Sequence, residues 1–197
     1  MGVTWVVVLI KDFDSAKQRL SPAMGARSRR ALARTNARLA VRAAAAGDTV
    51  LVVTGAEEVA DLARSWGAEV LLEPREEGQN VAARRGIDRA IAGGADAVLL
   101  LSSDLPLVNE QAVGEMLLSA SRRPAPVAVA APAIGRGGTN ALYLRPPGAI
   151  GLHFGDESLA QFRADAEQRG VAFHLFESDA LALDLDEPAD LARVSAV

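Results

Sequence analysis

The sequence predicts an α/β fold in which a mainly parallel, mixed sheet lies between two layers of helices. Short apolar runs alternate with helical stretches, which is the pattern of parallel strands joined by crossover helices. The runs are apolar throughout, as in strands that are buried on both faces. Half of the 197 residues are hydrophobic, so the chain can bury a sizeable core. Because no linker or repeat interrupts this pattern, we expect residues 1–197 to form one three-layer α/β/α domain.

The expected strands are short runs rich in Val, Leu and Ala that are bounded by turn residues. They comprise residues 4–10, 49–53, 69–72, 98–101, 127–131, 140–144, 171–176 and 180–183. The runs 127–131 and 140–144 are separated only by a glycine turn, so they form the expected antiparallel part of the sheet.

The stretches between these strands carry helix-forming residues and end at glycine stops. Residues 27–46 are rich in Ala, Arg and Leu, and Gly47 follows as a C-terminal stop. Pro188 suits the first position of a last helix, on whose surface we expect Asp190. The other expected helices are residues 57–66, 79–91, 110–121 and 157–169.

Composition and charge exclude several classes of function. The formal net charge is −4, and the 21 basic and 25 acidic residues are spread along the chain, so no nucleic-acid partner is expected. The absence of cysteine excludes disulfides and fits a cytoplasmic protein. The first apolar run is too short for a signal peptide or a membrane span, so no membrane partner is expected. Crossover folds of this size are often homodimers, so a homodimer is one possible oligomeric state of this chain.

Asp104 is a candidate metal ligand. It follows the buried run 98–101, and Pro106 prevents that strand from continuing. Open α/β sheets bind ligands at the carboxyl ends of their strands. A carboxylate at such a place is a good ligand for Mg2+. The alternative is that Asp104 caps the following turn or helix.

The loop that follows the first strand carries three cationic side chains, Lys11, Lys17 and Arg19. Several cations in one strand-to-helix loop suit a polyphosphate. The alternative is a solvated loop with ordinary surface charge. The loop lacks both the P-loop pattern and the glycine fingerprint of dinucleotide-binding folds, which disfavours those two classes.

Asp184 and Asp186 form a second acidic group, in the segment ALDLDEP. We expect this segment to be a strand end, in which residues two apart point to the same face. Two carboxylates on one face repel each other unless a cation lies between them. Capping of the last helix is the alternative for Asp186 alone.

A glycine turn before Thr139 and Asn140, together with residues 154–158 (FGDES), is the fourth candidate. Glycines and a hydroxyl at a helix start can hold a phosphate through backbone N–H groups. The alternative is an ordinary hairpin turn and helix cap. His153 and His174 are expected to be structural, because neither has a second histidine at metal-ligand spacing.

Taken together and in order, these segments resemble the 2-phospho-L-lactate guanylyltransferase family. That family includes the bacterial phosphoenolpyruvate guanylyltransferases of coenzyme F(420) biosynthesis. The resemblance covers nearly the whole chain. It rests on Lys11 with the AKxRL loop, GxN opening a helix, DLPL, GTNAL, FGxxS and the closing LDxDxPxDL. Two departures are visible, since Leu9 stands where the family has Pro and Gln79 where it has Leu.

The resemblance implies a nucleotide-diphospho-sugar transferase-like fold and a Mg2+-dependent guanylyltransferase. The donor would be GTP, and the acceptor a phosphorylated three-carbon acid: phosphoenolpyruvate, 2-phospho-L-lactate or 3-phosphoglycerate. The acceptor phosphate would attack the α-phosphorus of GTP, and pyrophosphate would leave.

The resemblance also assigns roles to individual residues. Lys17, Arg19 and Asp104 would be the catalytic residues, and Lys11 would join Lys17 and Arg19 at the β- and γ-phosphates. The remaining roles would be Mg2+ binding by Asp104, Asp184 and Asp186, acceptor binding by Thr139, Gly155 and Ser158, and contact with the base and ribose by Gly78 and Asn80.

Two other functions remain as alternatives. Molybdenum-cofactor and sugar-phosphate nucleotidyltransferases share the DLP and closing acidic motifs. They carry a GGxSxRMG loop after the first strand, where this chain reads KDFDSAKQRL. A non-catalytic nucleotide-binding module on the same fold is the second alternative, because fold alone does not determine function.

Overall fold

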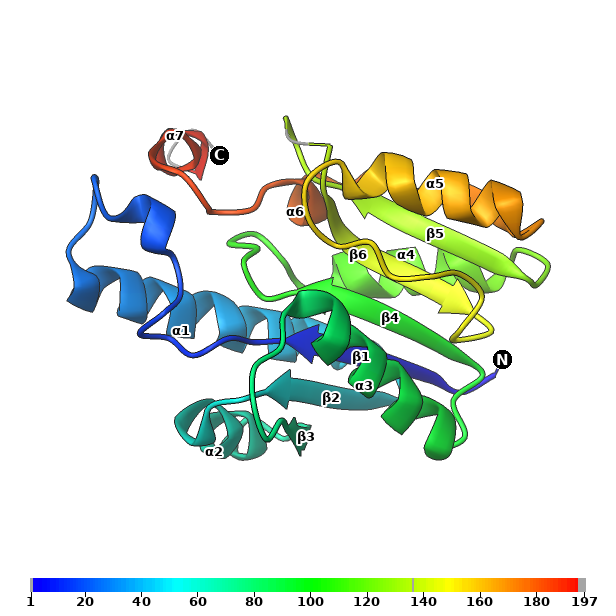
Figure 1. Cartoon of the computed structure of the whole chain (residues 1–197), viewed down its shortest axis with the longest axis horizontal. Helices are drawn as coiled ribbons and strands as arrows, with labels where there is room; N and C mark the ends of the chain where they lie inside the picture. The colour runs from blue at the N-terminus through cyan, green and yellow to red at the C-terminus, as the bar shows by residue number, and fades with distance from the viewer. Residues whose placement is uncertain (1, 136, 195–197) are drawn as a thin grey trace.

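The computed structural model describes residues 2–135 and 137–194. Within these residues one mixed sheet has the strand order β3-β2-β1-β4-β6-β5-β7 (Figure 1). Residues 1, 136 and 195–197, which belong to the expected domain, lie outside the described residues. The strands are β1 (Thr4–Leu9), β2 (Thr49–Thr54), β3 (Glu69–Leu72), β4 (Ala97–Ser102), β5 (Val127–Pro132), β6 (Thr139–Arg145) and β7 (Ala172–Leu175).

The sheet is mainly parallel, as predicted. β1 pairs in parallel with β2 and β4, and β2 with β3. β6 is the antiparallel strand, between β4 and β5, which confirms the expected antiparallel pair. In register, Leu9 lies beside Val53 and Ser102, so β1, β2 and β4 end at one edge of the sheet.

Helices cover both faces of the sheet. In the view of Figure 1, α3 (Gln79–Ala92) crosses in front of the sheet, while α1 (Ala26–Ala44) and α4 (Glu110–Ser121) lie behind it. The sheet therefore has an apolar core on each face. The residues of β1 are apolar throughout because their side chains point alternately into the two cores. Val6 and Val8 pack into the core with α1, α4 and α2 (Glu57–Ser65), whereas Trp5 and Val7 pack into the core with α3 and α5 (Ser158–Gln168).

One expected strand is a helix. Residues 180–183 were expected to be extended, but α6 (Asp179–Ala182) occupies this place. β5 already pairs with β6 on one side and β7 on the other, so no free edge of β5 remains for another strand. Leu181 instead packs against the sheet in the core. A four-residue apolar run does not separate strand from helix by periodicity.

The other expected elements are confirmed, with ends that differ by a residue or two. The loop after β1 also contains a short 3-10 helix, η1 (Gln18–Leu20), whose Leu20 is buried. The last helix, α7 (Pro188–Val194), begins at Pro188 as predicted.

Candidate active site

A cleft of about 350 Å³ opens at the carboxyl ends of β1, β2 and β4. This is the edge at which open α/β sheets bind their ligands. The loops after β1, β3 and β4 all contribute to its walls. Residues predicted for the site that line the cleft are Lys11, Lys17, Arg19, Gly78, Asp104 and Asp186.

The loop after β4 is fixed to the end of β1, and this places Asp104 in the cleft. Ser103 Oγ donates a hydrogen bond to the carbonyl oxygen of Leu9 at 2.9 Å. The Asp104 N–H donates to Ser102 Oγ at 3.3 Å. Leu105 is fully buried in the core. The backbone at Asp104 is therefore anchored, while its side chain stays 40% exposed.

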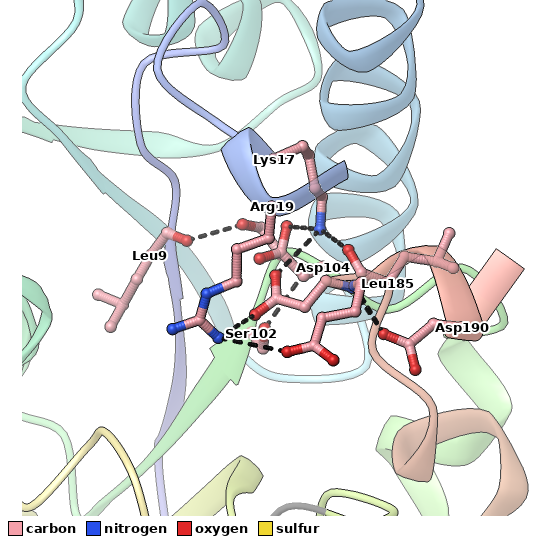
Figure 2. Close-up of polar contacts among 10 residues, drawn as sticks. Leu9, Lys17, Arg19, Ser102, Asp104, Leu185 and Asp190 are labelled. Atoms are coloured by element: carbon pink, nitrogen blue, oxygen red, sulfur yellow. Dashed lines mark hydrogen bonds and ion pairs between the residues drawn. The ribbon is translucent and has the colours of Figure 1, made fainter. Parts of the chain in front are cut away.

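Lys17 is a buried cation at the centre of the site. Its side chain is only 1% exposed. Its Nζ lies 2.6 Å from Asp104 Oδ1 and 4.0 Å from Asp186 Oδ1, and it donates to the carbonyl oxygen of Leu185 at 2.6 Å (Figure 2). The Lys17 backbone is left-handed, with φ 59°, which is uncommon for a residue with a side chain. The loop after β1 thus turns sharply to direct this ammonium at two carboxylates.

The acidic segment before α7 is not a strand, so the expectation of a strand end there is wrong. Leu183 and Leu185 are buried, and they alternate with the half-buried Asp184 and Asp186. The Leu185 N–H donates to the carbonyl oxygen of Asp104 at 3.1 Å. Leu185 therefore connects to both Asp104 and Lys17 through its backbone, and it holds Asp186 over the cleft.

Asp190 was expected on the surface of the last helix, and this expectation is wrong. Asp190 is 3% exposed. Its Oδ2 accepts the N–H groups of Asp186 at 3.0 Å and Glu187 at 2.8 Å. A side chain in the first helical turn that reaches back to N–H groups before the helix is half of a capping box. The sequence signal for this capping box is the position of Asp190, an acid three residues after Glu187.

The donor set at the cleft fits Mg2+ in part. Asp104 and Asp186 both approach the Lys17 ammonium, so two carboxylates already converge on one positive charge. Mg2+ is usually held by one or two carboxylates, with water and substrate phosphates completing its shell. Across residues 2–135 and 137–194, no three His, Cys, Asp or Glu side chains gather closely enough to hold a metal on their own. Asp184 does not line the cleft.

Arg19 lies at the rim of the site. Its NH1 is 3.9 Å from both Asp186 Oδ2 and Glu187 Oε1, and its side chain is 65% exposed. Such long, exposed ion pairs contribute little to stability. The guanidinium is therefore free to exchange these contacts for a ligand.

The residues assigned to the acceptor form a second group beside the cleft. Ser158 Oγ donates to Thr139 Oγ1 at 3.2 Å, and both side chains are buried. Gly155 has φ +137°, a conformation that favours glycine, and it precedes the start of α5. Thr139 and Ser158 are thus in contact, Gly155 lies three residues before Ser158 in the chain, and none of the three lines the cleft that contains Lys17.

Asn80 connects the two groups rather than lining the cleft. Its Nδ2 donates to the carbonyl oxygen of Phe154 at 3.0 Å, and its Oδ1 accepts the Phe154 N–H at 2.8 Å. The first turn of α3 is therefore clamped to the loop that carries Gly155. Asn140 has a comparable role, since its Nδ2 donates to the carbonyl oxygens of Leu181 at 2.8 Å and Ala182 at 3.1 Å.

His153 contributes a contact that supports the same loop. Its Nε2 lies 3.2 Å from Asp165 Oδ2, which also accepts the Gly151 N–H. Arg169 Nε donates to Asp165 Oδ1 at 2.6 Å. Burial alone raises the pKa of the Asp165 carboxyl, but the bonds from Arg169, Gly151 and His153 outweigh it and hold that pKa below its ordinary value.

Curated relatives match almost the full length of this chain. A phosphoenolpyruvate guanylyltransferase from Rubrobacter xylanophilus is 39% identical over 98% of this chain and 93% of its own. A 2-phospho-L-lactate guanylyltransferase from Methanothermobacter thermautotrophicus is 35% identical over 97% of this chain and 83% of its own length. A 3-phospho-D-glycerate guanylyltransferase from Phenylobacterium zucineum is 37% identical over 80% and 71%.

Solved structures confirm the nucleotide-diphospho-sugar transferase-like fold. A protein of that type from Desulfovibrio desulfuricans G20 superposes with a TM-score of 0.80 at 16% identity, over 98% of this chain and 87% of its own. A nucleotidyl transferase from M. thermautotrophicus gives a TM-score of 0.66 at 17% identity, over 98% of this chain and 95% of its own. None of the helices in the described part of the chain has the length and apolar character needed to cross a bilayer.

The sequence motifs and the cleft agree with the family comparison. The family described as "Guanylyl transferase CofC like" matches residues 4–195 of this chain. The chain belongs to the guanylyl transferase CofC-like family.

Proposed function

We propose that this protein transfers GMP from GTP to the phosphate of a small phosphorylated three-carbon acid and releases pyrophosphate. The observation that carries the proposal is the buried Lys17 ammonium between Asp104 and Asp186, at the ligand-binding edge of the sheet. The names of the relatives specify guanylyl transfer to phosphoenolpyruvate, 2-phospho-L-lactate or 3-phospho-D-glycerate. The product would serve coenzyme F(420) biosynthesis.

In this proposal the cations of the loop after β1 hold the triphosphate. An ammonium has three N–H donors. Asp104 and Leu185 engage two donors of Lys17, which leaves one for a phosphate oxygen. Lys11 and Arg19 line the same cleft and neutralise charge at the β- and γ-phosphates. The three cations together favour departure of pyrophosphate.

The chemical step needs no nucleophile from the protein. An oxygen of the acceptor phosphate attacks the α-phosphorus of GTP. The bond from that phosphorus to the α–β bridging oxygen breaks, and its electron pair leaves with pyrophosphate. Because the acceptor phosphate is largely ionised at neutral pH, no general base is required. Two anions must approach each other, so charge neutralisation is the main catalytic contribution.

Asp104 and Asp186 are the residues that would hold Mg2+, with Asp184 as a third carboxylate nearby in the sequence. When bound there, Mg2+ would supply charge neutralisation to the phosphate oxygens. Thr139, Ser158 and the backbone at Gly155 would orient the acceptor. Hydroxyl and N–H donors in that group suit both a phosphate and a carboxylate.

A pyrophosphate-release assay with Mg2+ tests this proposal. GTP, ATP, CTP and UTP are each combined with phosphoenolpyruvate, 2-phospho-L-lactate, 3-phosphoglycerate, a sugar phosphate and a pterin, and nucleotide binding is measured in parallel by calorimetry. Release with GTP and one of these acids supports the proposal and identifies the acceptor. Release only with a sugar phosphate or a pterin would assign the chain a different reaction on the same fold. Nucleotide binding without any release would instead support a non-catalytic module.

A further inference from the structure

The geometry points to Glu73 as the residue that recognises the guanine base, by accepting hydrogen bonds from its N1–H and 2-amino groups. This inference rests on the proposed guanylyl transfer and extends it to the choice of base. Glu73 lines the same cleft as Lys17 and Asp104. The mechanism above leaves Glu73 without a role.

Glu73 is placed rigidly at the end of β3. Its N–H donates to the carbonyl oxygen of Thr54 at 2.8 Å, which continues the pairing of β2 with β3 by one residue. Its side chain is only 5% exposed. On the carboxylate, Oε1 lies 2.5 Å from NH1 of Arg85, a residue of α3. A carboxylate so fixed in direction is a preorganised acceptor.

The Glu73 carboxylate has hydrogen-bond acceptor sites that no protein group uses among the described residues. A carboxylate offers about four lone-pair sites, and Arg85 engages one of them. The interactions within the described residues leave Oε2 without a partner. Oε2 is not fully buried, so a ligand in the cleft can reach this oxygen and donate a hydrogen bond to it. Glu76 also lines the cleft, but this residue is exposed, and its Oε1 already accepts a hydrogen bond from the Asp12 N–H.

The position of Glu73 separates it from the phosphate-binding cations. Asp104 follows β4, while Glu73 follows β3, and β2 and β1 lie between those strands. Three strand spacings amount to roughly 14 Å. Figure 1 shows the chain after β3 passing the tips of β2 and β1 to reach α3. An extended nucleotide with its phosphates at Lys17 would place its base toward β3.

The chemistry of the bases selects guanine. Guanine alone among the common bases presents two adjacent donors, N1–H and the 2-amino group, on its pairing edge. Adenine and cytosine present an unprotonated ring nitrogen at the central position, which a carboxylate repels. A site built to hydrogen-bond a group discriminates strongly against analogues that lack it. Glu73 thus gives a physical reason for preferring GTP.

The test compares Glu73→Gln with Glu77→Gln as a matched control. Glu77 also pairs with Arg85, but it does not line the cleft. Both variants therefore weaken the support of Arg85, and only one changes the proposed acceptor. Binding of GTP and of inosine triphosphate, which lacks the 2-amino group, is measured by calorimetry alongside pyrophosphate release.

We expect Glu73→Gln to weaken GTP binding about 10- to 100-fold and to abolish the preference for GTP over inosine triphosphate. Glu77→Gln should keep the wild-type preference. Xanthosine triphosphate carries an oxygen in place of the 2-amino group, so it should bind Glu73→Gln better than it binds the wild type. This gain shows that the variant is folded.

The outcomes separate the two proposals. Unchanged GTP preference in Glu73→Gln, with turnover intact, would overturn the assignment of Glu73 and leave guanylyl transfer standing. Loss of the binding preference in a protein that never releases pyrophosphate would support Glu73 and overturn guanylyl transfer. A wild type that binds GTP and inosine triphosphate equally would also overturn the Glu73 assignment.

Discussion

The Nζ atom of Lys17 lies 2.6 Å from Oδ1 of Asp104, and the two residues come from the loops that follow β1 and β4 (Figure 2). The lysine side chain is 1% exposed, so its charge is balanced by this carboxylate and by the Leu185 carbonyl rather than by water. Removing one partner of such a pair leaves a charge without compensation. The pair is therefore a fixed electrostatic unit in the wall of the cleft.

Replacement of Asp104 should lower turnover sharply. We expect Asp104→Ala to reduce the rate of pyrophosphate release by roughly 10²–10³-fold, because the site loses a carboxylate that pairs with Lys17 and that would bind the proposed Mg2+. Asp104→Asn should show a similar loss, since the amide keeps the shape but not the charge. Circular dichroism checks that both variants retain the fold.

Asp88 supplies the control for this prediction. It is an exposed carboxylate on α3, 3.9 Å from Arg84 and outside the cleft. Asp88→Ala should therefore turn over at the wild-type rate. Near-normal turnover by Asp104→Ala would show that the assignment of Asp104 is incorrect.

Chelation of divalent cations should separate activity from stability. Lys17 already lies between Asp104 and Asp186, so these carboxylates do not need a metal in order to coexist. We expect EDTA to abolish pyrophosphate release and Mg2+ to restore it, with the melting temperature in EDTA unchanged. Full activity in EDTA would refute a metal at this site, and a large drop in melting temperature would indicate a structural metal instead.

Asn80→Ala should act on the acceptor more than on the nucleotide. Both polar atoms of the Asn80 amide bond to the backbone of Phe154, which precedes Gly155 in the proposed acceptor group. We expect the KM for the acceptor to rise by about tenfold or more, corresponding to the loss of two hydrogen bonds. The KM for GTP should change much less. An effect confined to GTP would place Asn80 at the base or ribose.

Asp165 should make stability depend on pH below about pH 4. Its bonds to Arg169, Gly151 and His153 hold its folded-state pKa below the ordinary value. A lowered pKa contributes stability that is fully present above the unfolded value of about 3.9 and is lost as the pH falls through the folded value. We expect Asp165→Asn to unfold at lower urea concentration than the wild type at pH 6. That difference should shrink as the pH falls below about 4, and an equal difference at pH 3 and pH 6 would contradict the account.

The strands and the location of the cleft could be predicted because their signals are local. The run of Val and Leu before Asp104, followed by Pro106, determines both a buried strand and its end. A carboxylate at that end must then lie at the ligand-binding edge of the sheet. Lys17 and Arg19 were predictable for a similar reason, because several cations in the loop after a buried strand suit a polyphosphate.

The remaining features depend on contacts between distant segments. Nothing near Lys17 in the sequence indicates its burial, which requires the segment around Leu185 to pack over it. The pairing of Asn80 with Phe154 joins residues 74 positions apart. Residues 180–183 form a helix whose Leu181 packs against the sheet, a contact with segments distant in the sequence. A single acid after a short strand has no motif of its own, so the sequence carries no signal for Glu73.

The most direct test of guanylyl transfer is a ³¹P NMR spectrum of the complete reaction, with GTP, Mg2+ and the acceptor acid selected in the pyrophosphate assay. Guanylyl transfer would give pyrophosphate and, in equal amount, two coupled resonances from a new diphosphate that joins GMP to the acceptor. Formation of GMP and pyrophosphate without the coupled pair would show hydrolysis instead of transfer, and an unchanged GTP spectrum would contradict an enzymatic role.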